Sequence, residues 1–179
     1  MRTVEVSVFT ASELSKRSLE RAIEDYRAVY RSETDVEVIA SIAAAIEAAG
    51  FHMDKGFSIG PWVRCFLRVS GDDEVLNAEG DSALSWFLST FLAPYRMKDG
   101  SIQSCPFTGV CYDEDCIDHI RERLNDGYTV REAFEGLAEM GRQILEADEE
   151  ARCSPDDFID TADANRWEFT EDGKFWVAK

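Results

Sequence analysis

The stretch 129–151 constrains the fold more than any other part of the chain. Its apolar residues recur at three- and four-residue steps, the spacing of one face of an amphipathic helix, and they include Phe134, Leu137 and Leu145. Thr129 and Glu132 have the spacing of a capping box, which satisfies backbone N–H groups in the first turn of a helix. We therefore predict one long helix here, with a face that must pack against other elements.

The residues that follow carry shorter signals. Ser154 before Pro155 is typical of a helix start and predicts a second, short helix. Glu171-Asp172-Gly173 separates the segments 167–170 and 174–177, and this turn chemistry predicts a closing β-hairpin.

The earlier part of the chain mixes both periodicities. Alternating residues predict strands at 3–9 and 61–69, and helical spacing predicts helices that end near residue 31, at Gly50, at 92 and at 125. A capping-box pattern at Thr34 and Glu37 starts the second of these helices. The segment 93–112 lacks periodicity and is predicted as a long loop or an extended segment. We expect an α+β fold, a single domain over residues 1–179, with about five helices packed on a small, mostly antiparallel sheet and a C-terminal β-hairpin.

The charge is strongly acidic and unevenly distributed. The formal net charge is −17, and residues 101–179 alone carry 20 acidic and 8 basic side chains. Such a balance disfavours direct binding to nucleic acid or to an anionic membrane, because both require a basic face. It favours a partner protein with a basic surface. The alternative is that the charge serves only to keep the protein in solution.

No catalytic signature is found. The chain has no phosphate-binding loop, nucleophile elbow or zinc-protease motif, and only His52 and His119 could act as a base near neutral pH. We predict that the protein is not an enzyme and needs no cofactor. No apolar run is long enough to cross a bilayer, and the first residues do not read as a signal peptide, so we expect a cytoplasmic protein.

One cluster of metal-ligand residues has an alternative interpretation. Cys105, Cys111, Cys116 and His119 have the spacing C-x5-C-x4-C-x2-H, which resembles a three-Cys, one-His zinc site only loosely. The other interpretation is that small buried thiols and one helix histidine lie near one another in sequence. We predict no metal site.

Many of the acidic residues have a local explanation. Helix starts favour the acids at 113–115 and 156–157, Asp172 is a turn residue, and Glu135 and Glu146 can pair with Arg131 and Arg142. The carboxylates left over lie at helix ends, where the helix dipole disfavours negative charge. We predict that these five bind a partner: Asp148, Glu149, Glu150, Asp160 and Asp163.

The two ends of the chain resemble a family. The opening V-E-V-x-V-F-x-x-x-E-L-S-x-x-S-L-E-R-A-I-E-D-Y-R at 4–27 resembles the start of a family of small phage and prophage proteins. The segment A-N-x-W-E-F-T-E-D-G-K at 164–174 is similar to their closing segment. Members are loosely labelled "antitoxin of toxin–antitoxin system". The middle departs from the family, since GFSIGPWVRCFLRVS at 56–70 replaces its Gly/Ser-rich segment.

The resemblance implies a mobile-element origin and expression in the cytoplasm of a bacterial host. Together with the charge, it leads us to expect a phage-encoded protein that binds and inhibits a host defence complex of the anti-CRISPR or anti-restriction type. Its carboxylates would then act as a DNA mimic, in place of DNA phosphates. Two alternatives stay open: an antitoxin-like protein that neutralises a toxin by direct binding, and a zinc-stabilised structural or regulatory module. The sequence does not indicate an oligomeric state.

Overall fold

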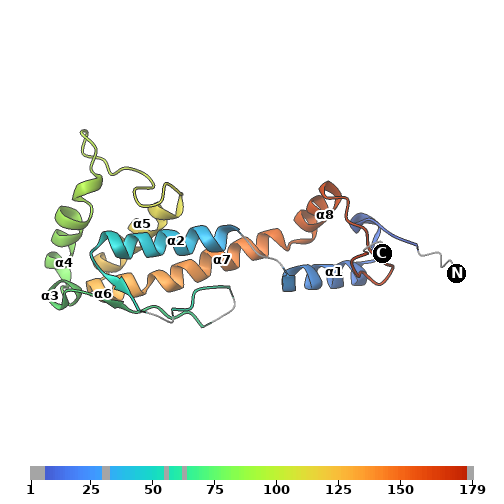
Figure 1. Ribbon diagram of the computed structural model, residues 1–179, viewed down its shortest axis with the longest axis horizontal. Coiled ribbons are helices and arrows are strands. Elements are labelled where there is room, and N and C mark those ends of the chain that lie inside the picture. The colour runs from blue at the N-terminus through green and yellow to red at the C-terminus, as the bar shows by residue number, and fades with distance from the viewer. Residues whose placement is uncertain (1–6, 30–32, 55–56, 62–63, 177–179) are drawn as a thin grey trace. The chain divides into compact units, whose positions relative to one another are not determined.

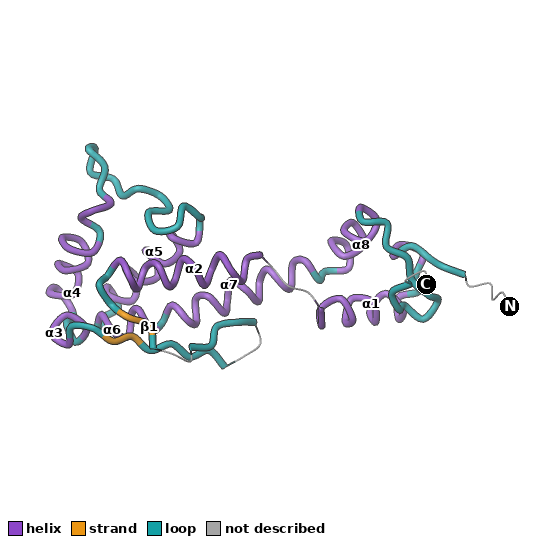
Figure 2. The backbone as a smooth tube through the Cα atoms, viewed as in Figure 1, coloured by secondary structure: helices purple, strands orange, loops and turns teal. Residues whose placement is uncertain are grey.

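The computed structural model describes residues 7–29, 33–54, 57–61 and 64–176. Helices dominate this part of the chain (Figures 1 and 2). A π-helical turn, Phe87–Phe91, extends α4, and single 3-10 turns lie at Ala11–Glu13 and Ala93–Tyr95. The α-helices are α1 (Lys16–Val29), α2 (Glu33–Ala48), α3 (Asp73–Leu76), α4 (Gly80–Trp86), α5 (Tyr112–Asn125), α6 (Val130–Glu135), α7 (Leu137–Arg152) and α8 (Pro155–Ala164).

The expected fold of about five helices packed on a sheet is wrong. Among the described residues the one sheet is a pair of two-residue strands, β1 (His52–Met53) and β2 (Val69–Ser70), which are antiparallel (Figure 2). The physical reason lies at Val69: its N–H donates to the Glu135 carboxylate at 3.2 Å, and its carbonyl accepts from Arg131 at 2.9 Å. These two α6 side chains occupy the backbone groups that a further strand would need. The sequence had predicted instead that Arg131 and Glu135 pair with each other.

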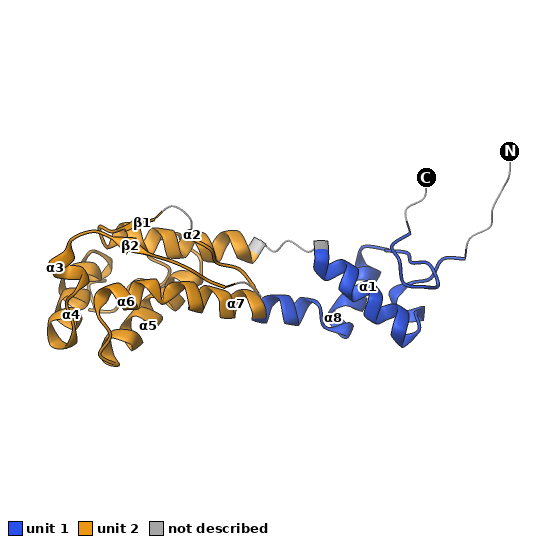
Figure 3. Cartoon of the chain, turned by 90° about the horizontal axis from the view of Figure 1, so that it is seen from below, with its two compact units in different colours: residues 1–32, 147–179 blue, residues 33–146 orange. Residues whose placement is uncertain are grey.

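Internal contacts divide the chain into two compact units (Figure 3). Unit 1 comprises residues 1–32 and 147–179, and unit 2 comprises residues 33–146. The boundary on the C-terminal side falls inside α7. Whether the chain behaves as a single domain stays a prediction.

Unit 2 is a helical body with a continuous apolar core. Helix α2 packs against α5, and fully buried side chains from α2, α6 and α7 meet in its core, among them Ile42, Phe134 and Leu137. Gly141 of α7 makes this packing possible, because a Cβ atom there would lie 2.9 Å from Ile59 and 3.0 Å from Ile42.

The predicted long helix is interrupted. The capping box of Thr129 and Glu132 is confirmed, but α6 ends at Glu135 and α7 begins at Leu137. Gly136 separates them, and a Cβ atom there would lie 2.8 Å from the His119 Nε2 of α5. A larger residue at position 136 would therefore have to displace the His119 ring, and the glycine, a poor helix former, lies at the one-residue break between α6 and α7.

Unit 1 is formed by the two ends of the chain. Phe169 forms antiparallel bridges to both Phe9 and Phe175, so the predicted closing hairpin is present as a bridge between Phe169 and Phe175. Most of the strand predicted at 3–9 lies outside the described residues. Tyr26 and Phe158 pack beside Trp167 in the core of this unit. The Ser154 cap of α8 is confirmed, since its hydroxyl accepts from the Asp157 N–H.

No helix in the described part of the chain is both long enough and apolar enough to cross a bilayer.

Candidate interaction surface

The five carboxylates predicted from sequence all belong to unit 1, and two of them have internal partners. Glu149 is only 8% exposed and pairs with Arg27 of α1 at 3.1 Å. Asp148 pairs with Arg152 one turn later at 3.3 Å. No local pattern predicts the Glu149 pair, because Arg27 lies more than a hundred residues away. These two acids therefore stabilise unit 1, and their place at a helix end needs no partner protein to explain it.

The other three predicted residues are exposed. Glu150 lies in the last turns of α7, and Asp160 and Asp163 lie in α8. The structure thus retains three of the five as surface carboxylates of unit 1.

The larger acidic excess lies in unit 2. Its residues include 21 acidic and 9 basic side chains, a net charge of −12, whereas unit 1 has 15 and 10, a net charge of −5. The asymmetry in the sequence between residues 1–100 and 101–179 therefore does not follow the structural division. Unit 2 is therefore the more acidic of the two units.

Helix α5 carries the most regular row of carboxylates in that unit. Glu114, Asp118 and Glu122 are exposed and recur every four residues, with Asp115 exposed beside them. Four residues of α-helix rise about 6 Å, so successive carboxylates lie about one turn apart along one face. Burial first, and then the charges of Glu114 and Asp118, raise the pKa of Asp115.

This row has little internal neutralisation. Asp118 pairs with Arg121 on the same helix at 2.5 Å, and both side chains are about half exposed, so the pair is weak. Our sorting of the sequence had assigned the acids at 113–115 to the helix dipole and therefore missed the row. The i, i+4, i+8 spacing was visible in the sequence and could have identified it.

Asp113 differs from its neighbours in being fully buried. Its Oδ2 accepts the N–H groups of Phe107, Thr108 and Gly109, and its Oδ1 accepts the Thr108 hydroxyl. Burial alone would raise the pKa of Asp113, but hydrogen bonds from Thr108, Ser41 and Phe107 outweigh it and hold the pKa below its usual value. Asp113 is thus a structural carboxylate that fixes the loop before α5.

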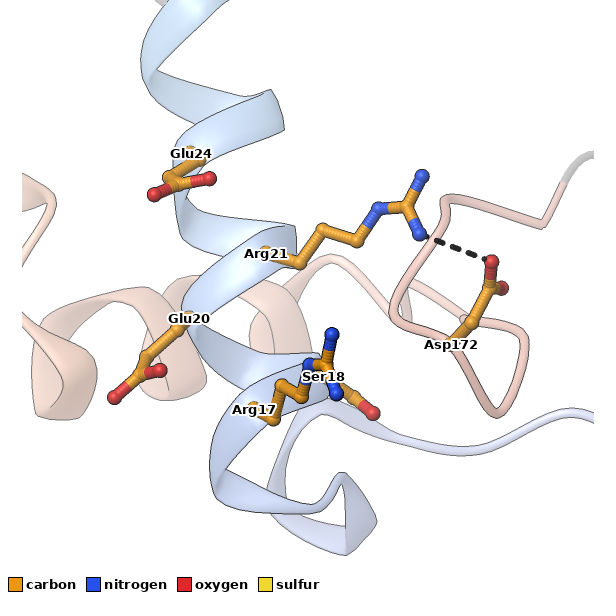
Figure 4. A pocket seen from close by; sticks show the side chains of 6 residues that line it. All are labelled: Arg17, Ser18, Glu20, Arg21, Glu24 and Asp172. Carbon is orange, nitrogen blue, oxygen red and sulfur yellow. Dashed lines mark hydrogen bonds and ion pairs between the residues drawn. The ribbon is translucent and has the colours of Figure 1, made fainter.

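A hollow of about 570 Å³ lies in unit 1, between α1 and the turn at Asp172 (Figure 4). Arg21 reaches Asp172 at 3.2 Å, whereas Glu20 and Glu24 point away from that turn. The lining consists of polar side chains of both signs, which differs from the mostly apolar lining of small-molecule sites. We interpret the hollow as the seam where the two ends of the chain meet.

The cysteine and histidine residues do not form a ligand set. No three His, Cys, Asp or Glu side chains in the described part of the chain are placed to hold a metal ion. Cys116 is buried, which raises the pKa of its thiol, while Cys111 is exposed. His119 points to the Gly136 turn with a buried Nε2 that has no hydrogen-bond partner among the described residues. The zinc-site alternative therefore has no geometric support.

Comparisons with protein-family models, curated proteins and solved structures find no match for this chain. Its function must be argued from its own surfaces.

Proposed function

We propose that this protein is an inhibitor that binds a basic, DNA-binding surface of a host bacterial defence complex, of the anti-CRISPR or anti-restriction type. The row Glu114, Asp118 and Glu122 with Asp115 beside it is the observation that supports this proposal. The phage origin and the bacterial cytoplasm rest on the resemblance of the two chain ends.

The physical argument concerns spacing and charge. A DNA-binding groove is lined by Lys and Arg placed to meet phosphates at regular intervals. A rigid helix that presents a carboxylate at each turn offers the same sign of charge at regular intervals, and it loses no conformational entropy of its backbone on binding. The net charge of −12 on unit 2 adds long-range attraction to such a groove.

The test compares two acidic surfaces of one protein. Glu114→Gln, Asp115→Asn and Glu122→Gln are combined in one variant, and Glu150→Gln, Asp160→Asn and Asp163→Asn form the matched control. Each protein competes with a labelled DNA duplex for a purified CRISPR effector complex and for a purified restriction enzyme, at low and at physiological salt. We expect the wild type to displace DNA, with an effect that weakens as salt rises.

Removal of three α5 charges should weaken competition about tenfold or more if each contact contributes roughly 0.5 kcal/mol. The control variant should compete like the wild type. If only the control variant failed to compete with DNA, the binding surface would lie on unit 1 instead. Competition that is insensitive to salt, or no competition with either complex, would contradict the proposal. Growth rescue on co-expression with a neighbouring toxin gene would then favour the antitoxin alternative.

A further inference from the structure

A shallow groove of about 240 Å³ lies on unit 2, and most of the residues that line it have apolar side chains. One wall is α2, through Ala44 and Ala48, and the other is the loop before α5, through Tyr95, Pro106 and Phe107. Glu47 is the single charged residue of the lining. The volume suits one large apolar side chain rather than a whole ligand.

The two walls are fixed to each other. The Ser41 hydroxyl of α2 and the Thr108 hydroxyl of the loop lie 3.1 Å apart, within hydrogen-bonding distance. Asp113 holds the same loop from α5 through the N–H groups of residues 107–109. Tyr95 packs edge-on against Phe107, with ring centroids 5.3 Å apart. The groove is therefore formed before any partner binds, which lowers the entropic cost of binding.

Helix α2 has an unusual composition for a helix with an exposed face. It contains no Lys or Arg, and its outward face is largely apolar, with Val36 71% exposed and Ala40 and Ala48 also exposed. An apolar face of a helix is normally packed against another element. The charged residues on its outward face, Glu37 and Glu47, are both acidic.

We propose that this groove binds an amphipathic helix of a partner protein, which inserts one apolar side chain between α2 and Phe107 and places a Lys or Arg beside Glu47. Charge complementarity selects this occupant: an apolar anchor alone would ignore Glu47, and an acidic partner would be repelled by it. A symmetric contact with a second copy of the chain would bring Glu37 and Glu47 against the same acids, which disfavours it.

The proposal does not depend on the α5 carboxylates, and its test uses defined probes. A short amphipathic helical peptide of Leu and Lys is titrated at physiological salt into protein with ¹³C-labelled alanine methyl groups. Its Leu and Glu counterpart is the charge control. We expect the Leu–Lys peptide to shift the methyl signals of Ala44 and Ala48, with those of Ala22 and Ala162 in unit 1 unchanged.

Two groove variants and one matched variant complete the design. Ala48→Phe fills the groove at an exposed position and should weaken peptide binding about tenfold or more, as expected for loss of a central anchor. Glu47→Gln should weaken it about two- to fivefold, the range for one surface ion pair, and Glu37→Gln, outside the lining, should leave it unchanged.

Three results would overturn the proposal: equal binding to the Ala48→Phe variant, equal binding of the Leu–Glu peptide, or shifts of Ala44 and Ala48 that depend on protein concentration alone. The last result would assign the groove to a second copy. The α5 triple variant should still bind the Leu–Lys peptide in the groove, so failure here and failure of the proposed DNA competition can be told apart.

Discussion

At the scale of single residues, burial decides which charges of this protein are structural. Glu149 is nearly enclosed and pairs with Arg27, whereas its neighbour Glu150 is exposed. We expect Glu149→Gln to lower the free energy of unfolding by about 1–2 kcal/mol, between the values for exposed and fully buried pairs. Glu150→Gln should change it by less than about 0.5 kcal/mol. Urea unfolding of both variants measures the difference, and equal effects would show that the Arg27 pair contributes nothing.

Gly173 provides a second prediction at this scale. Its φ is +82°, and a Cβ atom there would lie 2.1 Å from the Ser18 carbonyl oxygen of α1. In Gly173→Ala, the alanine has to adopt a strained left-handed backbone and its methyl group also has to displace the nearby α1 backbone. We expect the free energy of unfolding to fall by about 2–4 kcal/mol.

Gly127→Ala is the matched control, because Gly127 has a φ of +87° and nothing within 4 Å of its Cβ position. The free energy of unfolding of Gly127→Ala should fall by only about 1 kcal/mol, because the left-handed backbone is its only source of strain. Urea unfolding curves of the two variants give the comparison. Similar losses for both would mean that the close approach to Ser18 has no energetic consequence.

His119 gives the protein a predictable response to acid. Burial is the main cause that lowers its pKa from 6.5, and Arg123 lowers it further while Glu122 opposes the shift. The folded state therefore binds this proton less readily than the unfolded state does. Stability should be constant above about pH 7 and should fall as the pH drops through 6.5 towards the lower pKa of the folded state.

The measurement is the urea midpoint between pH 7.5 and pH 5.5. His119→Gln should flatten this dependence. An unchanged slope in the His119 variant would assign the pH dependence to other groups.

At the scale of elements, one carboxylate organises a loop. Asp113 accepts hydrogen bonds from three successive backbone N–H groups and from the Thr108 hydroxyl. Asp113→Asn removes the charge and replaces one acceptor oxygen with an NH₂ group, which would face the N–H donors of the loop. We therefore expect the free energy of unfolding to fall by about 2–3 kcal/mol. Hydrogen exchange at Phe107, Thr108 and Gly109 should accelerate.

Asp99→Asn is the control for that prediction. Asp99 also caps a turn, through the N–H and hydroxyl of Ser101, but it is exposed and water can replace it. Its replacement should lower the free energy of unfolding less than Asp113→Asn does. A larger effect at Asp99 than at Asp113 would contradict the structural role of the buried carboxylate.

Local signals in the sequence predicted several elements well. The capping box at Thr129, the cap at Ser154 and the long loop after residue 93 depend on neighbouring residues alone, and the structure confirms them. What the sequence could not predict depends on distant residues. The close approach of His119 to Gly136, at the α6–α7 break, comes from α5, and β2 gains no further strand because Arg131 and Glu135 bond Val69.

The candidate interaction surface shows the same contrast between local and distant residues. Asp148, Glu149 and Glu150 look alike in sequence, and only the fold brings Arg27 to one of them. The groove at Ala48 combines α2 with a loop more than forty residues later, and no local pattern announces it. The row on α5 was within reach of the sequence, since its spacing is that of a single helix.

At the scale of the whole molecule, the net charge of −17 opposes folding through repulsion between like charges. We expect added NaCl, from about 20 to 300 mM, to raise the urea midpoint, because the screening length shortens from roughly 20 Å to below 8 Å. The α5 triple variant, with less repulsion to screen, should respond less. A midpoint that falls with salt would show that ion pairs such as Arg142 with Glu139 and Glu146 outweigh the repulsion.

The contact between Phe9 and Phe169 has a consequence for the order of synthesis. On the ribosome, residues 33–146 are complete while the partner of Phe9 has not yet been translated, so unit 2 can begin to fold first. Unit 1 cannot fold until nearly the whole chain has been synthesised, because its two segments come from opposite ends of the chain. Bringing them together closes a loop of more than a hundred residues, which has a high entropic cost. A stop codon shortly after residue 146 would therefore spare the acidic α5 face and the groove, and would leave Phe9 and α1 without the segment that they pack against.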